Sequence, residues 1–214
     1  MTFQEFLNSV PKIRKSQLPG LAAQLEMAPS LRQEELEQLD VEALNPKKAG
    51  VMALIYPGVQ DLAMLSLILR KTYAGVHSNQ VGFPGGREEP EDEDLQATAL
   101  RETEEEIGVP RGQIQVVKRL TQVYIPPSNF SVCVYLGYTE QRPRFVPQEE
   151  EVEAIIEVPM AHLLDDAYLI EREMTTSYAG RIPVPAFKLE NHTVWGATAM
   201  MLSELKALMR LVNS

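Results

Sequence analysis

The sequence GGREEPEDEDLQATALRETEEEIGV, residues 85–109, decides how the rest of the chain is interpreted. Two glycines predict a turn, an acidic segment follows, and the next residues have the spacing of a helix that Gly108 ends. On that helix Glu102, Glu105 and Glu106 stand at i, i+3 and i+4, so they share one face. The stretch therefore predicts a loop–helix–loop unit that presents three carboxylates together.

Three like charges at this spacing repel one another, so a protein keeps them when a cation neutralises the cluster. Oxygen ligands favour hard ions, which predicts a Mg²⁺ or Mn²⁺ site that handles phosphate. The competing interpretation is a solvated acidic helix face. The glycine turn, Glu93, Arg101 and Gly108 all stand where a loop–helix–loop metal site needs them, and they favour the metal site. Arg101 is expected to pair with Glu93 and brace the loop against the helix.

The other flank of this helix is apolar. Leu100, Thr103 and Ile107 share that flank and are expected to face the core. The three glutamates are therefore expected on the opposite flank. Glu104 falls at the edge of the apolar flank, and no role in metal binding is expected for it.

Length and composition indicate a soluble globular chain. Its 214 residues suit one domain with a modest extension, and 44% of them are apolar. The net charge of −10 argues against nucleic acid and anionic membrane surfaces as partners, but not against a small phosphorylated substrate. Cys133 is the only cysteine, which excludes an intramolecular disulfide, and it is interpreted as a strand residue. No membrane-spanning run or signal-peptide layout is visible, so a cytoplasmic location is expected.

The expected fold class is α+β. Residues 1–48 predict a helical extension packed on the main domain of residues 49–214. The extension is expected either to cover the cleft or to form a contact in a homodimer. Helices are expected at residues 95–107, 159–164 and 197–212, and strands at residues 49–56, 62–69, 83–86, 114–120, 130–138, 152–158, 168–174 and 184–189.

At this point the opening stretch resembles the Nudix box: Gly, a spacer, Glu, seven residues, Arg-Glu, an apolar residue, any residue, Glu-Glu, any residue, Gly and an apolar residue. Seven residues separate Glu93 from Arg101. Two departures are visible: six residues instead of five separate Gly86 from Glu93, and Thr103 takes an apolar position. The resemblance implies an α/β/α sandwich with a mixed sheet, a metal-dependent pyrophosphatase, and the Gly86 carbonyl as a further metal ligand.

Flanking segments are similar to the coenzyme A pyrophosphatase branch of that superfamily. They are HSNQVGFPGG at residues 77–86, VPAF at 184–187 and WGATA at 195–199. Asn79 stands where the branch usually has glycine, and LILR at residues 67–70 matches its Leu-Leu-Thr-x-Arg element loosely. The resemblance covers about residue 50 to the C-terminus. It implies cleavage of coenzyme A or an acyl derivative into 3′,5′-ADP and a 4′-phosphopantetheine product.

The metal-site interpretation and the family resemblance together predict roles for individual residues. Glu102, Glu105 and Glu106 are expected to hold the metal and to acidify a bound water. The general base is expected among the box glutamates or in an acidic segment before a strand, where the resemblance favours Glu151 over its acidic neighbours Glu149, Glu150 and Glu153.

Cationic and aromatic residues complete the expected site. The candidates for binding substrate are Arg70, His77, Arg87 and Arg181. Trp195 is expected to pack in the core rather than to stack on adenine. Two alternatives stay open: a nucleoside diphosphate derivative such as ADP-ribose or a dinucleotide as the substrate, or a nucleotide-binding module without turnover.

Overall fold

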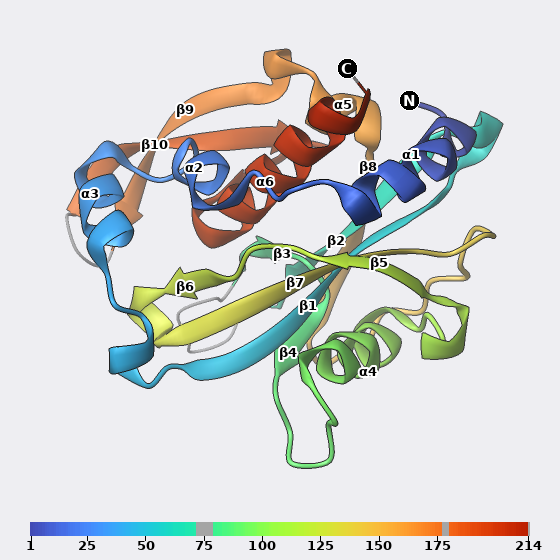
Figure 1. Cartoon of the computed structure of the whole chain (residues 1–214), viewed down its shortest axis with the longest axis horizontal. Coiled ribbons are helices and arrows are strands. Elements are labelled where there is room, and N and C mark those ends of the chain that lie inside the picture. Colours follow the sequence, from blue (N-terminus) through green and yellow to red (C-terminus); the bar gives the residue numbers. More distant parts are fainter. Residues whose placement is uncertain (72–78, 177–179, 214) are drawn as a thin grey trace.

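A mixed β-sheet forms the centre of the molecule (Figure 1). The computed structural model describes residues 1–71, 79–176 and 180–213, and within them the large sheet has eight strands. Its central strand β1 runs parallel to β7 on one side and antiparallel to β2 on the other. The eight strands are β1 (Lys47–Pro57), β2 (Ala63–Arg70), β3 (Val81–Gly82), β4 (Gly85–Arg87), β5 (Gln115–Arg119), β6 (Val123–Ile125), β7 (Phe130–Tyr138) and β8 (Val152–Pro159).

Helices cover both faces of this sheet. One face carries α4, and the other carries α1, α2 and α6 (Figure 1). Because both faces are covered, β1 and β7 are buried along most of their length. Cys133 lies buried in β7, as its place in an alternating run predicts. The helices are α1 (Phe3–Lys15), α2 (Gly20–Leu25), α3 (Ser30–Gln38), α4 (Leu95–Ile107), α5 (Met160–Leu164) and α6 (Gly196–Asn213).

A small antiparallel sheet lies beside α6 (Figure 1). The sequence predicts two of its three strands, but not the third, β11, which is a short run after the turn at Glu190 and Asn191. Its strands are β9 (Leu169–Thr176), β10 (Gly180–Leu189) and β11 (His192–Trp195). Five short 3₁₀ segments complete the described secondary structure: Glu42–Leu44, Val59–Asp61, Arg111–Gln113, Pro126–Ser128 and Asp166–Tyr168.

The first helices pack directly on the main domain. Phe6 and Ile13 of α1 and Leu25 of α2 are buried in the same hydrophobic cluster as Leu205 of α6. The buried carboxylate of Glu204 on α6 also accepts hydrogen bonds from Gly20 and Gln24 of α2. The extension is therefore continuous with the core of the domain.

Helix α4 begins and ends as its sequence predicts. The Asp94 carboxylate accepts a hydrogen bond from the Ala97 N–H at 2.8 Å and caps the N-terminus. Gly108 adopts φ 71° at the C-terminus, and its N–H donates to the Glu104 carbonyl at 3.0 Å. Helix α4 is thus fixed at both ends against β1 and β4.

Candidate active site

The three glutamates of α4 do not share a single environment. Glu106 is only 1% exposed and lies with Thr103 and Ile107 on the buried face of the helix. The expectation that it lies on the flank opposite the core is wrong, because its carboxylate accepts from the Gly85 N–H; Gly85 and Gly86 begin the short strand β4 instead of forming the predicted turn. Glu102 and Glu105 are more open, with side chains 15% and 49% exposed.

Arg70, Glu106 and Gly85 form a closed ring of polar contacts. The Gly85 N–H donates to Glu106 Oε2 at 2.7 Å, and Arg70 Nη2 donates to the Gly85 carbonyl at 2.6 Å. Arg70 Nη1 lies 3.0 Å from Glu106 Oε1 in an ion pair. The end of β2, strand β4 and α4 are thereby joined at one buried carboxylate.

Burial raises the pKa of Glu106 to about 7, against the opposing effects of Arg70 and the Gly85 N–H. Burial likewise raises the pKa of Glu102, and the adjacent Arg101 opposes the shift. Glu151 contributes to both upward shifts through its negative charge. The site thus concentrates negative charge, which a cation would relieve.

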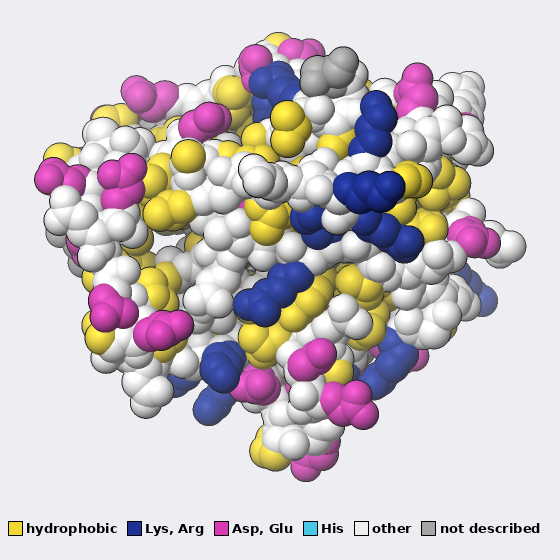
Figure 2. All heavy atoms as spheres, viewed as in Figure 1, with side chains coloured by type: hydrophobic (Ala, Val, Ile, Leu, Met, Phe, Trp, Pro, Cys, Tyr) yellow, Lys and Arg dark blue, Asp and Glu magenta, His cyan; other side chains and the backbone are white. Residues whose placement is uncertain are grey.

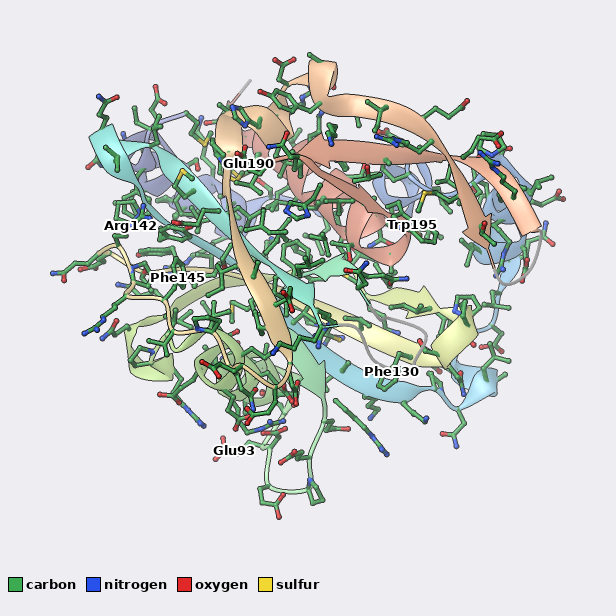
Figure 3. All side chains as sticks on the ribbon, turned by 180° about the vertical axis from the view of Figure 1, so that it is seen from behind. Glu93, Phe130, Arg142, Phe145, Glu190 and Trp195 are labelled. Carbon is green, nitrogen blue, oxygen red and sulfur yellow. The ribbon has the colours of Figure 1, made fainter. Side chains whose placement is uncertain are left out.

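Arg101 braces the loop against the helix, but its partner is Asp92 and not the expected Glu93. Its Nε and Nη2 donate to the two Asp92 oxygens at 3.0 Å each. A turn from Glu89 to Asp92 directs the Asp92 side chain inward, where it also accepts from the Glu89 N–H and the Thr98 hydroxyl. Glu93 is exposed and lies at the outside of the loop (Figure 3).

This correction also explains the irregular spacer. Five residues separate Gly86 from Asp92, which is the spacing that the box prescribes, whereas six separate it from Glu93. The extra residue therefore falls between Asp92 and Arg101. Glu93 keeps the seven-residue interval to Arg101, whereas Asp92 makes the contact with Arg101.

The remaining donors of Arg101 reach the cluster itself. Its Nη1 lies 3.0 Å from Glu102 Oε1 and 3.1 Å from Glu105 Oε2, and its Nη2 donates to the Arg87 carbonyl at 3.2 Å. Within residues 1–71, 79–176 and 180–213, no three acidic, histidine or cysteine side chains converge as a ready metal site. Arginines instead neutralise the carboxylates in this arrangement.

The residues present nevertheless fit a hard cation. Glu106 Oε1 is buried and receives no aligned hydrogen bond despite its ion pair with Arg70, so it is available as an oxygen ligand. Gly86 faces the Glu102 carboxylate so closely that a Cβ atom would overlap it. Glycine therefore keeps an oxygen-lined space open between β4 and the helix.

A cavity of about 840 Å³ opens from this site. Its wall includes the two open box glutamates, Arg70, Gly86, Arg87 and Arg101. Glu151 also lines it, whereas the neighbouring acidic residues Glu149, Glu150 and Glu153 lie outside its wall. Among the four candidates in that segment, only Glu151 is placed to face a bound substrate.

The expected substrate-binding residues fall in different places. Arg87 is exposed at the cavity edge, while Arg70 lines the cavity with its guanidinium engaged by Glu106 and Gly85. Arg70 is therefore placed to position the glutamate, and its contact with substrate stays a prediction. Arg181 lies outside the cavity wall, exposed on β10 and 2.8 Å from Glu173. His77 lies outside the described residues.

Trp195 is not the core residue that its position before α6 suggests. It is only partly buried and lines the cavity, as does Phe130 at the start of β7. Figure 3 shows the two residues on facing elements, one from the small sheet and one from the large sheet. Both aromatic rings are thus available to a ligand.

The extension contributes to the cavity, in agreement with one of the two alternatives that the sequence left open. Four of its residues line the wall, together with residues of β6, α6 and β4. Those four are Ala28, Pro29, Arg32 and Leu36. The sequence of α3 has no clear apolar side that would identify the surface that the helix faces.

The fold and the site together define a class of protein, the hydrolases that cleave phosphoanhydride bonds by means of a glycine pair and a carboxylate helix. The NUDIX domain model matches residues 46–178, and the chain belongs to this family. It is a Nudix hydrolase of the pyrophosphatase type. Members of the family generally use divalent metal cations.

Relatives of known sequence include a mitochondrial coenzyme A diphosphatase from Homo sapiens, 34% identical over 73% of this chain and 67% of its own length. The mitochondrial Nudix hydrolase 15 from Arabidopsis thaliana is 31% identical over 59% of this chain, which spans 45% of that protein. NudL of Yersinia pestis is 31% identical over 66% of this chain and 70% of its own length. Two of these names are mitochondrial, so a cytoplasmic location stays a prediction.

Solved structures share the fold at low sequence identity. A Nudix hydrolase from M. Smegmatis superposes with a TM-score of 0.53 at 15% identity, covering 78% of this chain and 87% of that one. A MutT/nudix protein from Enterococcus faecalis gives a TM-score of 0.51 at 17% identity over 87% and 76% of the two chains. The described part of this chain contains no helix long and apolar enough to cross a membrane.

Proposed function

We propose that the protein hydrolyses the diphosphate bond of coenzyme A or an acyl derivative, giving 3′,5′-ADP and 4′-phosphopantetheine or its acyl form. The observation that carries this proposal is the cavity of about 840 Å³, which joins the box carboxylates to a long apolar wall. Sites for small ligands and cofactors have volumes of about 300–1,000 Å³. The coenzyme A diphosphatase among the relatives supports the same substrate class.

Glu102, Glu105, Glu106 and the Gly86 carbonyl are the residues proposed to hold Mg²⁺ or Mn²⁺. The metal supplies charge neutralisation of the diphosphate and an acidified water. Arg70 on β2 holds the Glu106 carboxylate in place. Arg101 holds the loop through Asp92 and also contacts Glu102 and Glu105, the two more open glutamates. These two arginines let β4 and the helix act as one rigid unit.

In the hydrolysis the water oxygen forms a bond to one phosphorus, the bond from that phosphorus to the bridging oxygen breaks, and the bridging oxygen leaves with the other phosphate. One water proton passes to a carboxylate base, and the other remains on a product phosphate. Glu151 is the proposed base because it lines the cavity, with Glu102 and Glu105 as the alternatives. Arg87, exposed at the edge, is proposed to bind an outer phosphate.

A substrate panel tests this proposal. Purified full-length protein is incubated with coenzyme A, acetyl-coenzyme A, ADP-ribose, NADH and nucleoside triphosphates, each with Mg²⁺ or Mn²⁺, and the products are separated by chromatography. We expect 3′,5′-ADP as a product and the highest kcat/KM for a coenzyme A compound. A higher kcat/KM for ADP-ribose would replace the proposed substrate, and no turnover of any compound would favour a binding module.

A further inference from the structure

The wall of the cavity includes, besides the box carboxylates, a group of apolar residues from the extension, β6 and α6. We call this part of the cavity the aliphatic chamber. On the face shown in Figure 2 the surface is hollowed beside α3, next to β6. The residues that define the aliphatic chamber are Ala28, Pro29, Leu36, Ile125, Met200 and Met201.

The six residues that define the aliphatic chamber have apolar side chains, and Arg32 lines the same cavity. Two methionines give it an adaptable wall, because a thioether chain is unbranched and repacks easily. The side chain of Arg32 is 13% exposed, and its guanidinium forms an ion pair with Glu35 of the same helix at 2.9 Å. The aliphatic part of the Arg32 side chain therefore adds apolar surface. Such a wall suits a ligand group without hydrogen-bonding demands.

A nucleotide base is a poor match for this wall. The polar edge of adenine needs donors and acceptors, and its ring gains most from an aromatic platform. The rings of Tyr124, Phe130 and Trp195 line the same cavity and offer that platform. An alkyl chain needs neither, and it gains up to about 0.8 kcal/mol for each methylene removed from water.

We infer that the aliphatic chamber binds the acyl end of the substrate, so that α3 of the N-terminal extension selects acyl derivatives over free coenzyme A. This inference rests on the proposed function for the identity of the diphosphate end. Its own basis is the continuity of one cavity from Glu102 and Glu105 to Leu36. Leu36 is then a specificity-determining residue contributed from outside the matched family domain, which begins at residue 46.

The extension offers a matched pair of leucines for a test. Leu36 is partly buried against the core cluster and lines the cavity, whereas Leu31 on the same helix is 69% exposed and lies outside the wall. Helix α3 contains no fully buried residue, and Gln33 Nε2 ties it to the Leu25 and Ala28 carbonyls at 3.0 and 3.2 Å. Substitution of either leucine therefore leaves the core intact.

The experiment measures kcat/KM for coenzyme A and its acetyl, hexanoyl and decanoyl esters with the wild type, Leu36→Ser and Leu31→Ser. In the wild type, each methylene that enters the chamber raises kcat/KM by up to about fourfold. We expect Leu36→Ser to reduce the gain from acetyl to decanoyl at least tenfold. Leu31→Ser retains the wild-type dependence on chain length.

Leu36→Trp provides an independent variant, because its larger ring fills the chamber. It is expected to reject the decanoyl ester while it still accepts the acetyl ester. A chain-length dependence that is flat in the wild type, or unaffected by both Leu36 variants, would overturn the inference. An equal loss for free coenzyme A and ADP-ribose in Leu36→Ser would place a nucleotide there and also overturn it.

Binding of decanoyl-pantetheine separates this inference from the proposed reaction, because that probe lacks the diphosphate and the nucleotide. Calorimetric titration is expected to show binding to the wild type and to Leu31→Ser, and at least tenfold weaker binding to Leu36→Ser. Binding of this probe by a protein that leaves every coenzyme A ester intact would refute the reaction and uphold the chamber. If the protein cleaved the esters but did not bind this probe, the proposed reaction would be upheld and the acyl-binding role of the chamber would be refuted.

Discussion

The most constrained residue of the site is Glu106, although the sequence gives the three glutamates equal weight. It is buried, it accepts from the Gly85 N–H, and it pairs with Arg70, which also binds the Gly85 carbonyl. A buried carboxylate costs free energy unless such partners surround it. Glu106 therefore fixes β4 and the helix together, while the more open Glu105 remains accessible from the cavity.

The accessible glutamate gives the first prediction. Glu105→Gln retains the side-chain volume and removes the charge, so we expect kcat to fall by about two orders of magnitude, or roughly 3 kcal/mol of transition-state stabilisation. Steady-state kinetics with Mg²⁺ measure the effect. Glu104→Gln is the control, because Glu104 pairs with Arg111 at 2.6 Å outside the cavity. Equal kcat values for the two variants would remove Glu105 from the metal site.

At the scale of elements, the loop–helix unit was predictable in outline and not in its internal pairing. Helical spacing, the Asp94 cap and the glycine stop are local features, so the sequence suffices to predict α4 within its observed bounds. The choice between Asp92 and Glu93 depends on how the turn after Glu89 orients each side chain. No periodic pattern encodes that orientation.

The pairing of Asp92 with Arg101 gives a prediction at this scale. Asp92→Asn removes a two-point, charge-assisted contact, and we expect the free energy of unfolding to fall by about 2 kcal/mol at pH 7. Glu93→Gln is the matched control and is expected to change it little, because Glu93 is exposed. Urea denaturation followed by circular dichroism measures both values. A larger loss of stability in Glu93→Gln than in Asp92→Asn would make Glu93, and not Asp92, the partner of Arg101.

The same contact predicts how the difference depends on pH. Arg101 holds the pKa of Asp92 below its ordinary value, so the unfolded state takes up a proton first as the pH falls. The stabilisation is therefore complete above the unfolded pKa of about 3.9 and is lost below it, toward the folded pKa. The difference in unfolding free energy between the wild type and Asp92→Asn is expected to stay constant from pH 7 to 5 and to become smaller toward pH 3.

At the scale of the whole molecule, the sequence left open whether the extension covers the cleft or forms a contact in a homodimer, and the lining of the cavity supports the first alternative. The strands and helices of the main domain carry local periodicities, whereas the contacts of residues 28–36 with β6 and α6 join segments far apart in the chain. The partly exposed Trp195 was misassigned for the same reason, since its neighbours in sequence do not include the opposite wall. Long-range packing, rather than local pattern, builds the apolar half of this site.

The buried carboxylate of Glu204 joins the N-terminal extension to α6. Glu204 of α6 accepts from Gln24 Nε2 at 2.9 Å, the Gly20 N–H at 3.3 Å and the Thr121 N–H at 3.2 Å. The contacts with Gly20 and Gln24 hold the two ends of α2, and Thr121 belongs to the loop before β6. Removing the acceptor would leave three donors without their partner in the interior.

We therefore expect Glu204→Ala to lower the free energy of unfolding by about 3 kcal/mol. Because the lost contacts lie at α2, the extension is expected to loosen before the sheet, so that limited proteolysis cuts within residues 16–45 earlier than elsewhere. Urea denaturation and mass spectrometry of the fragments measure the two effects. Glu37→Ala on the exposed side of α3 is the control and should behave as the wild type. If Glu204→Ala lost stability without faster cleavage of the extension, Glu204 would stabilise α6 in general, and the extension would be held by its apolar contacts alone.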